Sequence, residues 1–404
     1  MKTVAVIAEY NPFHKGHEYQ LSRIRKELGA DNIIIIMSGN YVQRGEPAFM
    51  PFGLRTKAAL QNGADIVIKL PVCYATQGAD LFAYSAVSFL ERMHVADELC
   101  FSAENSNLSL LTKCAEDISN DNCCSSKVRE LMGSGLTFAA ARAELWPDYS
   151  ELLNKPNNIR ALEYIKSLKA LNSSIKPVVL ERIGSNYNDR EEKPDSFASA
   201  GAIRKAIISG DNSILRRQIP ENFQNTLRDL LGVSFPVTPD DFSEYLYYAI
   251  LSEQNNLKDF VDVNANLADK IINKLPEFTS FETFTDILKS KELTRTRISR
   301  ALLHIMLKIK GSNSVYKEIL PEICALQVLG INKNAGKILS KLKQNSEISL
   351  IGKIPAAYKS LNETTRKMFD NELYADTLYS HVISARYHVP FVHEYSKPME
   401  FVSR

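Results

Sequence analysis

Thr3-Val4-Ala5-Val6-Ile7-Ala8, and then His14-Lys15-Gly16-His17 after a five-residue connection, is the part of the sequence that decides the fold. The first run is short, apolar and rich in branched residues, which is typical of a buried strand in a parallel sheet. The connection contains Asn and Pro, as turns do, and a helical pattern begins near His17. Because the first turn of a helix has unpaired backbone N–H groups and a partial positive charge, this order predicts a phosphate site after the first strand.

His14 and His17 are three residues apart, so their side chains lie on one face of the helix start. From there they can donate hydrogen bonds to phosphate oxygens as charge develops on a pyrophosphate leaving group. Gly16 allows the backbone to approach a ligand closely. Two histidines at this spacing also occur as metal ligands, on surfaces and in cores, but the strand before them and the helix after them favour the nucleotide hypothesis.

The first 210 residues alternate short apolar runs with helical patterns, which indicates an α/β fold. We expect a doubly wound, Rossmann-like parallel sheet with strands at residues 3–8, 32–37, 66–70, 98–101 and 177–180. We expect helices at 17–28, 52–61, 80–93 and 158–171 on its two faces. Most of the strands precede Gly, Pro, Asn or Ser, so the ligand site is expected at the carboxyl edge of the sheet.

After residue 210 the strand pattern fades, and helical patterns dominate at residues 240–253, 267–274, 295–310 and 333–342. The sequence therefore predicts two domains. Residues 1–210 would form the α/β domain with the nucleotide site, and residues 211–404 would form a mainly α-helical C-terminal domain.

The composition is that of an ordinary globular protein, with 404 residues of which 45% are hydrophobic and 24% charged. The six cysteines contain no C-x-x-C pair, which suits reduced thiols better than a disulfide framework or a zinc site. No metal site is predicted. Because no apolar leader precedes the first strand and no apolar run reaches membrane-spanning length, we expect a cytoplasmic protein without membrane contact.

The formal net charge of +2 is too small to indicate a nucleic-acid partner, but the basic residues are unevenly distributed. Between residues 289 and 310, seven basic residues stand against one acid. Arg297, Arg300 and His304 are spaced by three and four, so they share a helix face that could meet RNA phosphates, while Arg295 lies off that face. A solvated charged surface is the plain alternative.

Three stretches of the sequence resemble one bacterial family. Residues 8–17 are Ala-Glu-Tyr-Asn-Pro-Phe-His-Lys-Gly-His, residues 37–47 are Met-Ser-Gly-Asn-Tyr-Val-Gln-Arg-Gly-Glu-Pro, and residues 63–71 are Gly-Ala-Asp-Ile-Val-Ile-Lys-Leu-Pro. The H-x-G-H motif is shared by a superfamily of nucleotidyltransferases, whereas the second stretch is particular to the tRNA(Met) cytidine acetate ligases. The chain is similar to this family over its full length.

The resemblance implies that residues 1–210 are a nucleotidyltransferase-like, ATP-binding catalytic domain and that residues 211–404 are a helical tRNA-binding domain. It implies an ATP-dependent ligase that activates acetate as acetyl-adenylate and acetylates N4 of the wobble cytidine of elongator tRNA(Met). Acetate has to be activated because the exocyclic amine of cytosine is a poor nucleophile and acetate a poor acceptor of attack. ATP would be the co-substrate, and Mg²⁺ would accompany it, although no acidic cluster marks a dedicated site.

The resemblance also implies the site residues. The catalytic residues would be His14, His17, Arg204 and Arg44. The ATP-binding residues would be Ile7, Ala8, Glu9, Tyr10, Asn11, Pro12, Phe13, Lys15, Gly16, Glu18, Tyr19, Gln20, Ser102, Asn157, Asn158, Arg182, Ile183 and Ser199. A substrate loop would contain Ser38, Gly39, Asn40 and Gln43. The tRNA would contact Arg295, Arg297, Arg300, His304, Lys333, Lys337 and Lys341.

Two of these assignments also have support from residue chemistry. Ser199 precedes a run of small residues and is a good N-cap, which leaves backbone donors for a phosphate, with Arg204 near the first turns of the same helix. A plain helix start with a solvated arginine is the alternative. Arg44 and Gln43 lie in a long loop at the expected active edge, and an arginine suits both a small carboxylate and a phosphate. A surface loop is the alternative there.

Two other functions remain open from the sequence alone. A small-molecule adenylyltransferase of cofactor biosynthesis would share the H-x-G-H motif, although such enzymes are usually shorter and lack the basic helical part. A non-catalytic protein that binds RNA or a nucleotide would keep the pocket without turnover, and intact His14, His17 and Arg204 count against it. The sequence leaves the oligomeric state open.

Overall fold

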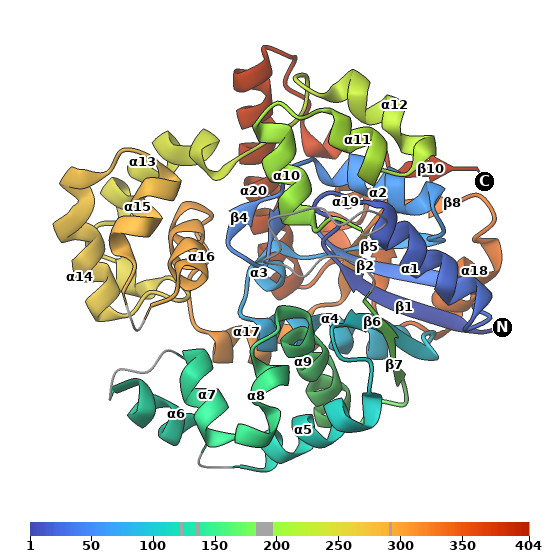
Figure 1. Ribbon diagram of the computed structural model, residues 1–404. Helices are drawn as coiled ribbons and strands as arrows, with labels where there is room; N and C mark the ends of the chain where they lie inside the picture. The colour runs from blue at the N-terminus through green and yellow to red at the C-terminus, as the bar shows by residue number, and fades with distance from the viewer. Residues whose placement is uncertain (122–123, 134–137, 183–196, 291–292, 404) are drawn as a thin grey trace.

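The structure is a computed structural model of the 404-residue chain that describes residues 1–121, 124–133, 138–182, 197–290 and 293–403 (Figure 1). In this part of the chain the centre is an eight-stranded sheet with the order β10-β8-β5-β2-β1-β6-β7, and β9 pairs with β8 outside that path. Neighbouring strands are parallel, except that β5 and β8 are antiparallel. The strands are β1 (Thr3–Ala8), β2 (Asn32–Ser38), β5 (Ile66–Leu70), β6 (Glu98–Ala103), β7 (Lys176–Glu181), β8 (Ala325–Asn332), β9 (Ser349–Ile351) and β10 (Glu400–Val402).

The predicted fold class is confirmed, because the mostly parallel sheet carries helices on both faces. Side chains of β2 alternate between the faces, with Ile34 and Ile36 in one core and Ile33 and Ile35 in the other. The first core contains residues of α3 (Val72–Ala75), α4 (Ala79–Met93), α5 (Leu108–Asn120) and α9 (Pro156–Ala170). The second contains residues of α1 (Lys15–Lys26), α2 (Phe52–Gln61), α10 (Ala200–Ile208), α11 (Ser213–Gln218) and α12 (Glu221–Leu230).

The five strands that the sequence predicts are present within two residues of their expected ends. Three strands after residue 210 were not predicted: β8, β9 and β10 belong to the mainly helical part of the chain, yet they extend the same sheet beyond β5. The lack of a side chain at Gly330 allows β8 to pack closely against α2. A Cβ at this position would stand 2.7 Å from Cγ2 of Thr56 in that helix. Residues 211–404 are mainly helical, as predicted, with these three strands in addition, and the domain boundary at residue 210 stays a prediction.

Four helices between residues 243 and 306 lie to one side of the sheet, at the left of Figure 1. They are α13 (Ser243–Glu253), α14 (Ala265–Lys274), α15 (Phe281–Leu288) and α16 (Arg295–Met306). Their core is continuous with the first core of the sheet, since Leu246, Ile298 and Leu302 belong to the same buried cluster as Ile34. Other helices are α6 (Cys124–Gly133), α7 (Phe138–Leu145), α8 (Ser150–Leu153), α17 (Asn313–Ile319), α18 (Gly336–Asn345), α19 (Ile354–Ala357) and α20 (Glu363–Tyr387). Among the described residues no helix is both long and apolar enough to cross a membrane.

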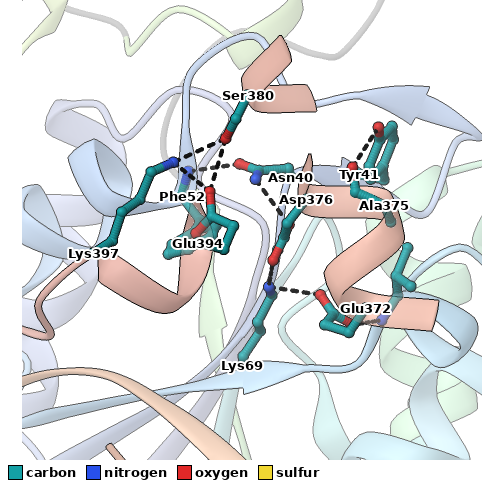
Figure 2. A network of polar contacts seen from close by, with 12 residues as sticks. Asn40, Tyr41, Phe52, Lys69, Glu372, Ala375, Asp376, Ser380, Glu394 and Lys397 are labelled. Atoms are coloured by element: carbon teal, nitrogen blue, oxygen red, sulfur yellow. Dashed lines mark hydrogen bonds and ion pairs between the residues drawn. The ribbon is translucent and has the colours of Figure 1, made fainter. Parts of the chain in front are cut away.

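Helix α20 covers the loop that follows β2, and a buried charged network joins the two (Figure 2). Lys69 of β5 pairs with Glu372 (Nζ to Oε1, 2.6 Å) and with Asp376, and all three side chains are buried. Asp376 also accepts a hydrogen bond from Nδ2 of Asn40 (2.8 Å). Burial opposes the charge of Lys69, but the two carboxylates raise its pKa above the ordinary value. The network fixes how α20 docks, because loss of one partner leaves an unpaired buried charge.

Candidate active site

A cavity of about 210 Å³ lies at the carboxyl edge of the sheet, where β1, β6 and β7 end. Ala8, Ser102 and Glu181 line it from these three strands. The first turns of α1 and α10 also line it, through Gly16 and Gly201. The cavity therefore lies between two helix N-termini, whose partial positive charge favours an anion.

His14 and His17 form a capping box at the start of α1. The backbone N–H of Gly16 donates to Nδ1 of His14 (3.1 Å), and the backbone N–H of His14 donates to Nδ1 of His17 (3.3 Å). The two rings are stacked, with their centroids 3.8 Å apart. Tyr10 and Phe13 pack against the ring of His17. The pair thus caps the helix while both rings line the cavity.

These hydrogen bonds set the protonation of both rings. Since each Nδ1 accepts a hydrogen bond, the proton of each neutral imidazole resides on Nε2, and that nitrogen is a donor. Burial, with the Arg182 guanidinium nearby, lowers the pKa of His14 to about 3. Burial, the neighbouring His14 and Arg182 lower the pKa of His17 well below its ordinary value. Both side chains are therefore neutral hydrogen-bond donors at physiological pH.

Helix α10 brings a hydroxyl cap and an arginine to the cavity wall. The hydroxyl of Ser199 accepts a hydrogen bond from the backbone N–H of Ala202 (3.1 Å), so Ser199 is the N-cap that the sequence predicts. One turn further, Nη1 of Arg204 donates to the backbone carbonyl of Asn11 (2.7 Å). This bond holds the guanidinium against the connection between β1 and α1, and Arg204 lines the same cavity as the two histidines.

Glu9, directly after β1, contacts two other segments near the cavity. Its Oε1 accepts a hydrogen bond from the backbone N–H of Gln43 (2.7 Å), and its Oε2 faces Nη2 of Arg160 in α9 (3.3 Å). The arginines that line the cavity outnumber its carboxylates, which suits a polyanionic ligand. They are Arg23, Arg44, Arg160, Arg182 and Arg204, against Glu9, Glu46 and Glu181.

Comparison with known proteins identifies the family. A family model described as HIGH Nucleotidyl Transferase matches residues 1–389. A tRNA(Met) cytidine acetate ligase of Clostridium perfringens (strain SM101 / Type A) is 34% identical over 394 residues, covering 94% of this chain and 95% of that protein. This chain belongs to the tRNA(Met) cytidine acetate ligase family. A ligase of the same name from Thermoanaerobacter sp. (strain X514) is 36% identical over 392 residues, with 94% and 95% covered. The resemblance seen in the sequence is confirmed.

Solved structures agree with this family assignment in their fold. The crystal structure of Thermotoga maritima TmcAL in its apo form I superposes with a TM-score of 0.90 at 25% identity, and both chains are covered completely. The same protein bound with alpha-thio ATP gives a TM-score of 0.88 at 24% identity, again with full coverage.

Most of the predicted nucleotide residues of this cytidine acetate ligase family member line the cavity. The four predicted catalytic residues do so, as do Ile7, Ala8, Glu9, Tyr10, Asn11, Gly16, Tyr19, Gln20, Ser102, Asn157, Arg182 and Ser199. Pro12, Phe13, Lys15, Glu18 and Asn158 do not line it. Ile183 lies outside the described residues. Asn158 instead accepts the backbone N–H of Asn105 (2.9 Å), and the ring of Phe13 packs on His17.

The predicted substrate loop divides into a cavity part and a buried part. Ser38 and Asn40 are buried and, with Gly39 between them, lie under α20 rather than in the cavity wall. Nδ2 of Asn40 donates to Asp376, and its Oδ1 accepts from the backbone N–H of Phe52 (3.0 Å). These three residues do not line the cavity, so they do not contact a ligand bound in it. Gln43 is also absent from the wall, and its side chain donates to the backbone carbonyl of Gln77 (3.2 Å).

The predicted RNA-facing stripe on α16 is largely turned inward. His304 is fully buried, with Nδ1 3.0 Å from the carbonyl oxygen of Val261 and Nε2 3.1 Å from that of Thr76. The expectation that His304 meets RNA phosphates is therefore corrected, since its ring is buried between the backbone of Val261 and that of Thr76, which follows α3. Arg300 is mostly buried and bonds Asp262 (Nε to Oδ2, 2.8 Å). Arg297 keeps 42% of its side chain exposed.

The remaining basic residues have separate environments. Arg295 at the start of α16 faces three carboxylates, those of Asp286 (3.0 Å), Glu282 (3.5 Å) and Glu46 (3.7 Å). Lys333 follows β8, which is antiparallel to β5, and the backbone N–H of Asn332 bonds the carbonyl of Asp65. Lys333 therefore lies at the amino edge of the parallel strands, at the opposite edge from the cavity. Lys337 and Lys341 follow it in α18. Their tRNA contacts stay a prediction.

Several cavity residues were missed by the sequence analysis. Arg160 could have been found, because it stands three residues after Asn157 and so shares its helix face. Phe197 and Glu46 also line the cavity. Neither belongs to a residue pattern that predicts a ligand contact, and each is brought there by the fold of the segment around it. Within the described residues, no group of three or more His, Cys, Asp or Glu side chains is placed to hold a metal ion.

Proposed function

We propose that this protein is an ATP-dependent ligase that first joins acetate to AMP and then transfers the acetyl group to N4 of the wobble cytidine of elongator tRNA(Met). Membership of the tRNA(Met) cytidine acetate ligase family supports the overall reaction. One observation supports the first half-reaction above all: two neutral Nε2–H donors and two helix N-termini surround the same cavity.

In that half-reaction a carboxylate oxygen of acetate attacks the α-phosphorus of ATP, and the bond to the bridging oxygen of the leaving pyrophosphate breaks. The electron pair passes to pyrophosphate, so negative charge grows where His14, His17 and Arg204 lie. Neutral donors fixed before the reaction stabilise this charge without reorganisation. Arg44 and Arg160 also line the cavity, and we assign them to the acetate carboxylate or the α-phosphate.

In the second half-reaction the N4 amine of cytidine attacks the carbonyl carbon of acetyl-adenylate, AMP leaves with the electron pair, and the amine loses one proton. The target base lies in a single-stranded loop, which leaves its edge accessible. The exposed part of α16 around Arg297 is the surface that we assign to such a loop, because Arg295 of the same helix reaches Glu46 of the cavity wall (3.7 Å). A tRNA substrate agrees with the predicted cytoplasmic location.

Mg²⁺ would accompany ATP on its phosphate oxygens. The chain offers isolated glutamates near the cavity, and Glu9 is already paired with Arg160, so we assign no protein ligand to the ion.

The direct test is mass spectrometry of nucleosides from tRNA(Met) that lacks the modification, after incubation with the protein, ATP and isotope-labelled acetate. We expect labelled N4-acetylcytidine at the wobble position. Pyrophosphate released with acetate alone would show that the adenylate forms before tRNA arrives. ATP binding without any labelled nucleoside would overturn the proposal in favour of a small-molecule transferase or a non-catalytic binder.

A further inference from the structure

The hairpin that carries Arg44 is fixed on both sides of that residue by different parts of the molecule. The hairpin consists of β3 (Tyr41–Val42) and β4 (Glu46–Pro47), and its turn closes with the backbone N–H of Gly45 on the carbonyl of Val42 (3.0 Å). On the amino side of Arg44, the backbone N–H of Gln43 is held by Glu9. On the carboxyl side, the carbonyl of Gly45 accepts a hydrogen bond from the hydroxyl of Ser299 in α16 (2.8 Å).

The contact between Gly45 and α16 is close enough to exclude any side chain at residue 45. A Cβ on Gly45 would stand 2.3 Å from the backbone nitrogen of Arg300 and 2.5 Å from its Cα. Gly45 also has a φ of +78°, which a residue with a Cβ adopts at a cost. Backbone therefore packs directly on backbone at this point, and Ser299 is buried there with only 3% exposure.

Helix α16 is itself held rigidly at this contact. Arg300 bonds Asp262, and His304 one turn later lies between Val261 and Thr76. Although burial raises the pKa of the Asp262 carboxyl, the Arg300 guanidinium beside it brings that pKa below its ordinary value. At the start of the helix, Arg295 reaches Glu46 on the second strand of the hairpin (3.7 Å). Helix α16 thus contacts the hairpin at two residues, Gly45 and Glu46.

We infer that Gly45 and Ser299 are positioning residues through which helix α16 sets the place of Arg44 at the adenylation site. The inference rests on the proposed function, because it gives Arg44 a role in the attack of acetate on ATP. It means that the helical region takes part in the first half-reaction and not only in tRNA binding. Neither residue touches the cavity itself.

The decisive variant is Gly45→Ala, with Gly232→Ala as its matched control. Gly232 has nearly the same φ, +77°, but a Cβ there meets nothing within 4 Å, so both variants carry the same backbone cost and only one displaces a contact. The measurement is acetate-dependent exchange of labelled pyrophosphate into ATP, together with calorimetric ATP binding. A displacement of about 1 Å at a reacting group lowers the rate by about 10²-fold.

We expect Gly45→Ala to lose about 10²-fold in kcat/KM for acetate, and Ser299→Ala about fivefold, the worth of one buried hydrogen bond. ATP affinity should stay within about twofold, because α1 and α10 are untouched. The control should match wild type. In an Arg44→Ala background, Gly45→Ala should change the rate little further, since a residue that acts through Arg44 has nothing left to position.

Three results would overturn the inference. They are a Gly45→Ala variant as active as Gly232→Ala, an Arg44→Ala variant with wild-type kinetics, or an equal loss from Gly45→Ala with and without Arg44. If Gly45→Ala fails to fold, Ser299→Ala and its cycle with Arg44→Ala decide the question in the same way. Absence of labelled N4-acetylcytidine after incubation of the wild-type protein with ATP, acetate and tRNA(Met) is a separate result, which removes the proposed function and not only the role of α16.

Discussion

Helices α1 and α16 both carry polar side chains at spacings of three or four residues, yet they use them in opposite ways. In α1, the rings of His14 and His17 line the cavity and leave both Nε2 atoms as donors. In α16, Arg300 and His304 turn inward, and only Arg297 of the three keeps a large exposed fraction. The comparison teaches that spacing identifies a shared face, whereas the neighbouring apolar residues decide what that face contacts.

The largest effect should come from α1. We expect His14→Ala or His17→Ala to lower kcat for acetyl-adenylate formation by about 10² to 10³, the usual cost of removing one donor to a developing charge. Pyrophosphate exchange measures this directly. His94→Ala is the matched control, since that histidine is exposed and pairs only with Glu347 among the described contacts. Retained adenylation in the His14→Ala and His17→Ala double variant would contradict the role given to the pair.

The second prediction concerns the inward face of α16. His304→Ala should lower the free energy of unfolding by about 2 to 4 kcal/mol, because it leaves a cavity and removes the partner of buried carbonyl groups. Urea denaturation measures this, and the exposed His381 gives a control within about 0.5 kcal/mol. Unchanged stability with weakened tRNA binding would instead support the surface role first expected for His304.

The sequence predicted the parts of the fold that are coded locally. Each early strand is a short apolar run bounded by turn residues, and the H-x-G-H segment lies at a strand-to-helix junction that topology places at the ligand edge. Ser199 was recognisable as an N-cap from its own chemistry. These features depend on a few neighbouring residues, so they can be inferred without knowing the rest of the molecule.

What the sequence did not predict depends on contacts between distant segments. Strand β8 joins the sheet beside β5, more than 250 residues earlier in the chain. Asn40 was expected at the substrate and is instead held by Asp376 of α20. His304 lies between Leu303 and Ile305, both fully buried, and that apolar setting was the available sign that it faces the core. Long-range pairing of this kind leaves little trace in local spacing.

The third prediction uses the neutral state of the buried histidines. The native pKa values of His14, His17 and His304 all lie below the ordinary value of 6.5, to about 3 for His14, chiefly because of burial. Below pH 6.5 the unfolded chain binds protons that the native protein does not, so acid lowers the free energy of unfolding, and stability is regained as pH rises through 6.5. Each histidine contributes up to about 1.4 kcal/mol per pH unit in that window.

Urea denaturation between pH 7.5 and 5.5 should therefore show a shallower loss of stability in a His14→Gln and His17→Gln double variant than in wild type. The buried Glu372 and Glu394 have raised pKa values and act with the opposite sign, but they are the same in both proteins. The difference between the two curves isolates the pair. Parallel curves would mean that His14 and His17 titrate normally in the native state.

The smallest effect should come from the outward side of α16. Arg297→Ala should weaken tRNA binding by about fivefold at low salt and reduce the salt dependence by about one counterion, since one exposed phosphate contact is lost. Adenylation without tRNA should be unchanged, because Arg297 lies outside the cavity wall.

Lys337→Ala, on the opposite edge of the sheet, should change tRNA affinity less than Arg297→Ala does. Filter binding over a range of salt concentrations separates the two variants. An equal effect of both would place tRNA across both edges, and loss of adenylation in Arg297→Ala would remove the distinction between the inner and outer sides of this helix.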